Sequence, residues 1–362
     1  MDGNLRLNHF FVKYFEAIRT LVAVLIGFGV SLLFIYFISD EPVKAISTYM
    51  FKPFDGIRRI GSMVEYMIPI MFCGLGMCMM MSVGQFNLIG DGANFLAASA
   101  VAYISTCLIP NCPPILFPVI LIIAGAVIGG GCGVIPAYLQ SKFKTNIVVV
   151  SLMANYILIL GGVYMLLYWM RDPSKTYVGS YAIPEAAKLT NIIPKTKVST
   201  GIILAFLATI AVFWFLYRTK PGYQMRLIGK NAAFAKYSGI NVVKYAIIAQ
   251  VIGGALAGMG GAIDTLGKYD RFIWLASNGY GFDGMMIAVI AKGNPAYIPA
   301  AALFLAYIRI GADIVGQTTD VPLDFVLVVQ SIIVMLVAAV SFMSGFRQKS
   351  VVKIANAEKA GV

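Results

Sequence analysis

The 362-residue chain is 59% hydrophobic and only 12% charged, and its formal net charge is +12. Soluble domains carry roughly 25% charged residues, so this chain has too few to cover an ordinary wetted surface, and lipid must cover much of it. The basic residues are spread over loops between apolar runs and form no aromatic-interleaved patch, which argues against a nucleic-acid-binding protein. Cationic loops facing an anionic cytoplasmic leaflet explain the charge instead.

Nine apolar runs are long enough to cross a bilayer core of about 30 Å, which needs roughly 20 residues per helix. They lie near residues 20–38, 63–81, 93–109, 115–137, 147–169, 199–217, 245–266, 297–317 and 322–343. A shorter run at 283–292 follows a polar, glycine-rich stretch and counts as a tenth, partly broken span. We therefore predict an all-α polytopic membrane protein with about ten transmembrane helices, formed by one domain over residues 1–362.

The distribution of Lys and Arg predicts which side each loop faces. Basic residues near span ends favour the cytoplasm, and they predominate in the N-terminal segment 1–19, the loop 218–244 and the C-terminal tail 345–362. The loop 170–198 mixes both signs and is placed outside, where it could hold a short surface helix. Both termini are therefore predicted to lie inside.

The inside loop 218–244 contains six basic residues and no acidic one. Within it, the stretch Asn231–Ser238 has a helical pattern, with Asn231 suited to the N-cap and Gly239 suited to a C-terminal stop. Such a helix is either an element for docking a partner or a simple connector. The sequence leaves both open and favours docking.

The sequence offers no catalytic or metal-binding constellation. His9 is the only histidine, and the five cysteines follow no metal-binding spacing. The phosphate-binding loop GxxxxGK[ST], HExxH and GxSxG are also missing. We therefore predict a protein that is not an enzyme, so that uphill transport would draw its energy from an ion gradient or from a partner.

Two polar, glycine-containing segments interrupt the apolar pattern at membrane depth. They are Ser82–Gly92 and Asn278–Gly284, about half the chain apart, and each ends in Asp-Gly before a small-residue apolar helix. Transporters built from structural repeats carry broken helices at matching positions in their halves, and the solute site lies there. The similarity of the two segments predicts a pseudo-repeat of two halves with two broken or re-entrant segments.

These segments supply the candidate solute-binding residues. Polar side chains able to hydrogen-bond a solute are Asn87, Asp91, Asn94 and Asp283, and Phe86 and Phe282 offer apolar faces. Alternatively, both aspartates are helix caps that satisfy backbone N–H groups where water is missing. A cap can also lie beside a permeation path.

Residues 221–241, followed by the glycine-rich run 253–261, resemble the cytoplasmic coupling region of ABC importer permeases for branched-chain amino acids, monosaccharides and nucleosides. Three further segments, 85–92, 145–156 and 281–295, are similar to nucleoside-type permeases that work with basic-membrane-protein lipoproteins. The resemblance runs from about residue 60 to 340, and its segment 145–156 adds Asn155 to the candidate solute site. Members commonly have Phe-Asn-Ile-Gly-x-Glu-Gly where this chain has Phe86–Gly92 with Asp91, which leaves riboflavin and monosaccharides open as solutes.

The resemblance implies a bacterial inner-membrane permease that works with three partners. These are a cytoplasmic ATP-binding subunit that holds ATP and Mg, a second and shorter permease in a heterodimer, and an extracytoplasmic solute-binding lipoprotein. The residues implied to meet the ATPase are Tyr223, Arg226, Lys230, Asn231, Ala232, Ala235, Lys236 and Gly239. The rival hypotheses are an ion-coupled secondary transporter, against which the docking-like loop argues, and a membrane-embedded lipid enzyme, for which no catalytic cluster is found.

Overall fold

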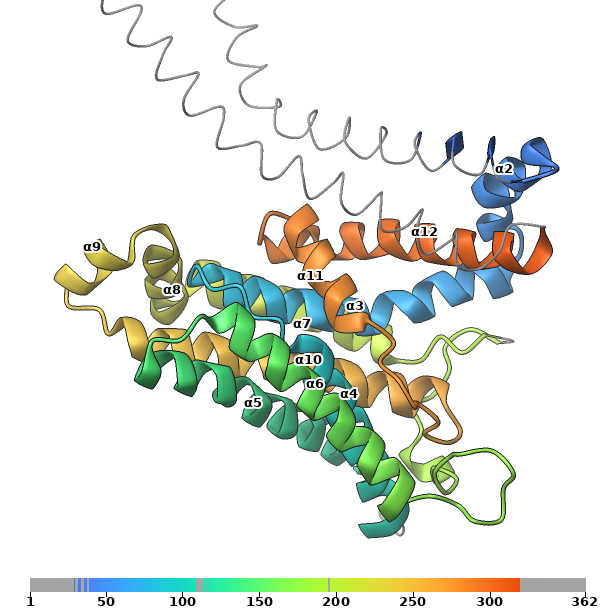
Figure 1. Cartoon of the computed structure of the whole chain (residues 1–362), viewed down its shortest axis with the longest axis horizontal. Helices are drawn as coiled ribbons and strands as arrows, with labels where there is room; N and C mark the ends of the chain where they lie inside the picture. The colour runs from blue at the N-terminus through green and yellow to red at the C-terminus, as the bar shows by residue number, and fades with distance from the viewer. Residues whose placement is uncertain are drawn as a thin grey trace, which may run out of the picture. The chain divides into compact units, whose positions relative to one another are not determined.

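The computed structural model describes residues 29, 32–33, 36–37, 39–108, 113–114, 116–194 and 196–319 (Figure 1). Every regular element among them is helical. The α-helices are α2 (Pro42–Phe51), α3 (Ile57–Ser82), α4 (Gly90–Tyr103), α5 (Phe117–Phe143), α6 (Ile147–Tyr164), α7 (Gly201–Arg218), α8 (Lys220–Lys230), α9 (Ala232–Tyr237), α10 (Val242–Lys268), α11 (Tyr280–Ile290) and α12 (Ile298–Thr318). Short turns of other helix types are η1 (Lys52–Phe54), η2 (Ile104–Leu108), η3 (Met165–Trp169), η4 (Glu185–Ala187) and η5 (Pro295–Tyr297).

The chain divides into two compact units. The large unit is Gly56–Tyr307, and the small unit combines the described residues up to Asp55 with those from Ile308 onward. In the small unit, Ala45 and Tyr49 of α2 pack with Ala312 and Val315 of the second half of α12. The large unit holds all the candidate site residues.

The prediction of an all-α membrane protein is confirmed. Six helical stretches of the described residues are long and apolar enough to cross a membrane: Ile57–Ser82, Phe117–Phe143, Ile147–Tyr168, Gly201–Arg218, Val242–Lys268 and Pro295–Thr318. The count of ten stays a prediction, because the run 20–38 lies mostly, and the run 322–343 wholly, outside the described residues. The outside loop shows one helical turn, η4, and two isolated β-bridges.

Helices α3 and α10 form the centre of the large unit. In their most apolar stretches 83% and 67% of residues are buried, against 33% for α5 and 28% for α7, so the latter two present most of their surface outward. Helix α10 packs against α3, α4 and α5. A helix surrounded on several sides needs small residues where neighbouring backbones approach, and the run 253–261 supplies them.

Glycines bring the backbones of α5 and α10 into direct contact. A Cβ added to Gly258 would lie 2.2 Å from the Gly125 carbonyl oxygen, and one added to Gly129 would lie 2.3 Å from that of Gly254. Between α3 and α10, a Cβ at Gly76 would lie 2.4 Å from the Gly253 oxygen. Without a hydrophobic driving force between helices in lipid, such close packing provides much of the association energy.

We expect Gly258→Ala to destabilise the protein by about 1–3 kcal/mol, because its methyl group overlaps the α5 backbone and forces the helices apart. The matched control is Gly131→Ala on α5, where an added Cβ meets no atom within 4 Å. The measurement is the unfolding temperature of each purified variant in the same detergent. Equal unfolding temperatures would show that this contact does not set the helix spacing.

Candidate functional site

Both broken segments end beside the middle of a long helix. A Cβ added to Gly92, in the first turn of α4, would lie 2.6 Å from the carbonyl oxygen of Asn155, near the middle of α6. One added to Gly284 of α11 would lie 2.4 Å from the Cβ of Cys73, well inside α3. Helix α4 continues directly into η2, whereas α11 has 11 residues, or about 16 Å, which is short of the bilayer core of about 30 Å. The interruptions therefore lie at depth.

Asp91 joins the two broken segments. Its carboxylate accepts hydrogen bonds from the Gly281 backbone N–H at 3.0 Å and from the Ser277 hydroxyl at 2.5 Å, and the residue is 3% exposed. Contact is close because Gly281 has no side chain: a Cβ there would lie 2.1 Å from the Asp91 nitrogen. A carboxylate from α4 thus satisfies backbone and side-chain donors at the start of α11.

The aspartates do not occupy the N-cap positions that the cap interpretation assigns them. The N-caps are Ile89 for α4 and Gly279 for α11, and Asp91 and Asp283 lie in the first turns that follow. A negative charge there is favoured by the helix dipole. Asp283 is 2% exposed and accepts a hydrogen bond from the Tyr66 hydroxyl of α3.

A chain of amide side chains holds the segment before α4 against α10. The Asn87 Nδ2 donates to Gln250 Oε1 at 2.5 Å, and the Gln250 Nε2 donates to Gln85 Oε1 at 2.7 Å. Asn87 also accepts from the Ile89 N–H at 2.9 Å through Oδ1. Asn87 and Gln250 are buried, at 2% and 0% exposure, so each relies on these partners in place of water.

Two further predicted site residues, Asn94 and Asn155, are buried. Asn94 donates to the Ala257 carbonyl of α10 at 3.1 Å. Asn155 accepts from the Gly92 N–H at 2.5 Å, while its Nδ2 has no hydrogen-bond partner among the described residues. A buried donor without a partner is costly and uncommon, so Asn155 can still bind an acceptor on a solute or water.

A small cavity lies between α3, α4, α10 and α11. Its volume is about 10 Å³, and its wall includes Asn87, Phe282 and the side chains of Met77, Met80 and Met285. This is room for about one water molecule. Phe86, by contrast, is 36% exposed and does not line this cavity. The structure therefore shows a closed arrangement in which the predicted polar residues bind other groups of the protein.

The helix predicted at the inside loop is α9. Asn231 is its N-cap and accepts from the Phe234 N–H at 3.0 Å, and Gly239 follows with φ of +80°, a conformation that favours glycine. In Figure 1, α8 and α9 lie beyond one end of the large unit, while the loop 170–198 lies at its other end. Ala235 is fully buried, whereas Lys230 and Lys236 are exposed.

Arg226, predicted to meet the ATPase, also contacts groups of the protein itself. Its Nε donates to the Leu216 carbonyl at 3.0 Å, and its guanidinium lies 4.6 Å from the centre of the Tyr217 ring, so it holds α8 against α7. The sequence interpretation missed two of the three exposed aromatic side chains of α8 and α9. Tyr223 of α8, which was predicted, is 58% exposed; Phe234 and Tyr237 of α9, which were not, are 56% and 92% exposed.

The sequence also did not predict four side chains that take part in the hydrogen bonds of the site, namely Tyr66, Gln85, Gln250 and Ser277. Gln250 is an uncharged polar residue among apolar neighbours in the first half of α10, and that pattern could have singled it out. Ser277 and Tyr66 carry no such signal. Within the described ranges, no group of three or more His, Cys, Asp or Glu residues could hold a metal ion.

Comparison with known proteins places the chain among transport proteins. The profile of the family described as branched-chain amino acid transport system, permease component, matches residues 60–338. The nucleoside ABC transporter permease protein NupB of Lactococcus lactis is 26% identical, over 88% of this chain and 89% of its own. The guanosine permease protein NupP of Bacillus subtilis is 26% identical over 95% of this chain and 98% of its own. The glucose permease protein TsgB13 of Haloferax volcanii is 22% identical over 93% of this chain and 90% of its own.

Proposed function

Because the chain belongs to the branched-chain amino acid transport permease family, we propose that it is the nucleoside-conducting membrane subunit of an ABC importer. Membership makes it a multi-pass membrane protein and a non-catalytic transport subunit, and it implies a separate ATPase and a solute-binding partner. The nucleoside, the site residues and the arrangement of partners are our proposal.

The observation that carries the proposed site is the bond network at Asp91. One carboxylate joins the first turn of α4 to the start of α11, beside the small cavity and the spare donor of Asn155. When those bonds open, the same groups offer donors and acceptors of the kind a ribose needs, and Phe282 with the methionines offers an apolar wall for a base. Two of the reported relatives are named for nucleosides.

Glucose and riboflavin are the alternatives on the same scaffold. A relative named for glucose covers nearly the whole chain at slightly lower identity. All of these solutes carry several hydroxyl groups, and the asparagines and aspartates of the site can bind hydroxyls in each case. Competition between solutes therefore has to distinguish them.

We place α8 and α9 on the cytoplasmic side, with both termini also inside, in a bacterial inner membrane. Six basic residues of the loop 218–244 and Lys142 and Lys144 of the neighbouring α5–α6 connection lie at this end, as the positive-inside rule expects. The exposed aromatic rings of Tyr223, Phe234 and Tyr237, beside Lys230 and Lys236, suit a protein partner, since aromatic residues are enriched in interfaces. That partner is the ATPase, and we propose a second, shorter permease in the same membrane.

Helix α8 can pass a movement of the docked ATPase to the first broken segment. A Cβ added to Gly229 would lie 2.4 Å from the Ser82 carbonyl oxygen and 3.1 Å from the Gly84 nitrogen. The end of α8 thus contacts the residues that lead into Gln85 and Asn87. On the other side of the loop, α10 binds the same two residues through Gln250.

Helices α8 and α10, on either side of α9, therefore both contact the segment Ser82–Gly92 that leads into α4. Displacement of α8 relative to α10 would strain the amide chain at Asn87 and, a few residues further, the bonds of Asp91. Closely packed interiors respond to small shifts by switching arrangement, since they cannot deform continuously. This gives a physical route by which ATP hydrolysis in the partner opens the closed site.

Cells that carry this gene should take up labelled uridine and adenosine faster than cells that lack it. The strain should have no other nucleoside importer, and uptake should be challenged with excess unlabelled nucleosides, nucleobases, ribose, glucose and riboflavin. We expect nucleosides alone to suppress the gene-dependent uptake. Suppression by glucose or by riboflavin would replace the nucleoside with that solute, and uptake independent of the gene would remove the nucleoside assignment.

The double variant Lys230→Glu with Lys236→Glu reverses two exposed charges of α8 and α9, where we propose that the ATPase docks. It should weaken binding of the ATPase at least tenfold. The physical reason is the loss of two cations at a surface that depends on electrostatic complementarity. Co-purification of the ATPase subunit from membranes measures it. Lys175→Glu, an exposed charge in the loop at the opposite end, is the control. Normal co-purification of the double variant would rule out docking through these lysines.

The variant Gly229→Ala should retain the ATPase and its ATP hydrolysis but transport severalfold less solute per ATP, because the methyl group displaces α8 from Ser82. Gly131→Ala, which has space for its methyl group, should behave as the parent protein. Both are measured in proteoliposomes with the complete importer. An unchanged ratio of transport to hydrolysis would show that the contact between Gly229 and Ser82 is not part of the coupling.

A further inference from the structure

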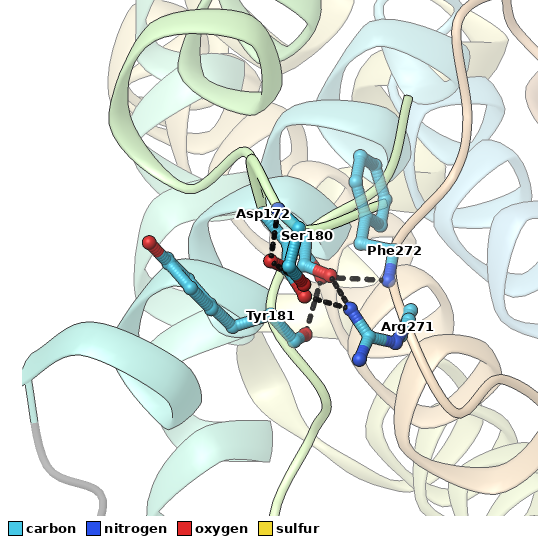
Figure 2. A network of polar contacts seen from close by, with 6 residues as sticks. Asp172, Ser180, Tyr181, Arg271 and Phe272 are labelled. Atoms are coloured by element: carbon cyan, nitrogen blue, oxygen red, sulfur yellow. Dashed lines mark hydrogen bonds and ion pairs between the residues drawn. The ribbon is translucent and has the colours of Figure 1, made fainter. Parts of the chain in front are cut away.

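A polar network lies at the end of the large unit opposite α9, between the outside loop and the segment 269–279 that links α10 to α11. Figure 2 shows Asp172 and Ser180 on one stretch of chain facing Arg271 and Phe272 on the other. We call these four residues the Arg271 network. The Arg271 Nη1 donates to Asp172 Oδ2 at 2.6 Å and to the Ser180 carbonyl oxygen at 2.9 Å.

Ser180 adds three bonds to this network and is fully buried. Its backbone N–H donates to the Phe272 carbonyl, and its hydroxyl oxygen accepts from the Phe272 N–H, both at 2.9 Å. The hydroxyl proton goes to the Tyr181 carbonyl at 2.8 Å. Arg271 and Phe272 are thus fixed to the outside loop through both backbone and side chain (Figure 2).

The Asp172 carboxylate of the network stays charged over the physiological pH range. The hydroxyl and N–H of Ser174 donate to the Asp172 carboxylate, and together with Arg271 they lower the Asp172 pKa to about 2. Since the pKa in an unfolded chain is about 3.9, the contribution of Asp172 to stability is present above that value. It is lost only as the pH falls toward 2.

The segment that follows the network has no regular secondary structure until α11 begins at Tyr280. Its backbone therefore depends on tertiary contacts to stay in place. The rings of Phe272 and Trp274 pack against Phe95 of α4, at 5.9 and 5.8 Å between centres. Beyond them, the Gly279 N–H donates to the Ser277 hydroxyl oxygen at 3.0 Å, and Ser277 donates to Asp91.

The segment is thus fixed at two ends, by Arg271 at the outer side and by Asp91 at the proposed solute site. We propose that Arg271 is a positioning residue, which holds the segment 269–279 to the outside loop and thereby sets where Gly281 and Asp283 lie at that site. This inference rests on the proposed function. It makes the outside loop part of the apparatus that shapes the solute site.

The competing explanation is a local brace, in which Arg271 only keeps the outside loop folded. The same two stretches of chain contain a suitable control. The Nζ of Lys188 binds Glu185 at 2.7 Å and Asp270 at 2.6 Å. The Glu185 and Asp270 side chains are 88% and 77% exposed, so this ion pair joins the same loop to the same segment at the surface, where such pairs contribute little.

The test compares Arg271→Gln with Arg271→Lys, Asp172→Asn and the control Lys188→Gln. Hydrogen–deuterium exchange of the full chain in lipid nanodiscs is followed over residues 272–281, where the amides of Phe272, Gly279 and Gly281 are bonded in the parent protein. We expect Arg271→Gln to speed exchange at least tenfold through to Gly281. Arg271→Lys should have a smaller effect, since it can keep one of the two bonds, and Lys188→Gln should leave residues 277–281 unchanged.

In the complete importer, Arg271→Gln should also lower the initial uptake rate at least tenfold while the ATPase stays bound. Faster exchange confined to Phe272, or uptake at the parent rate, would overturn the proposal in favour of the local brace. If Arg271→Gln does not fold, the exchange and uptake of Asp172→Asn decide between the proposal and the local brace, since this variant weakens only one bond. Hydrogen–deuterium exchange is measured without solute, so its result does not depend on the nucleoside assignment. A wrong nucleoside assignment would instead show as a lack of nucleoside uptake by the parent protein.

Discussion

The arrangement of the large unit depends on how it satisfies backbone polar groups where helices break inside the membrane. No water is present in the bilayer core to bind them, and each unsatisfied group costs several kcal/mol. Here one carboxylate, Asp91, binds the Gly281 N–H and the Ser277 hydroxyl, and one carboxamide, Asn155, binds the Gly92 N–H. The starts of α4 and α11 can lie at depth because α4 and α6 provide these acceptors.

Such bonds need short distances, and the glycines provide them. Gly281 lets Asp91 approach its backbone, Gly92 lets α4 approach Asn155, and Gly284 lets α11 approach α3. The same principle brings α10 against α5 and α3. The polar site is therefore surrounded by the most tightly packed helices of the unit, so that opening it for a solute must move whole helices as well as side chains.

The sequence predicted what depends on local properties. Long apolar runs placed the helices, Asn231 and Gly239 marked the ends of α9, and the Asp-Gly pairs marked the interruptions. It could not predict which groups meet. Asp91 binds Ser277, which lies 186 residues further along the chain. Nothing in the sequence around Ser277 or Tyr66 indicates a hydrogen-bond partner. The family resemblance implied that Arg226 meets the ATPase, but its stacking on Tyr217 depends on how α8 turns back on α7.

The two broken segments are each held by a different end of the unit, and they meet in the middle. The segment before α4 is bound by α8 and by Gln250 at the end where we propose that the ATPase docks. The segment 269–279 before α11 is bound to the loop 170–198 through Arg271 at the opposite end. Asp91 is the bond between them. A permease must respond to an ATPase on one side and to a solute-binding partner on the other. With this connectivity, a force applied at either end reaches the same carboxylate.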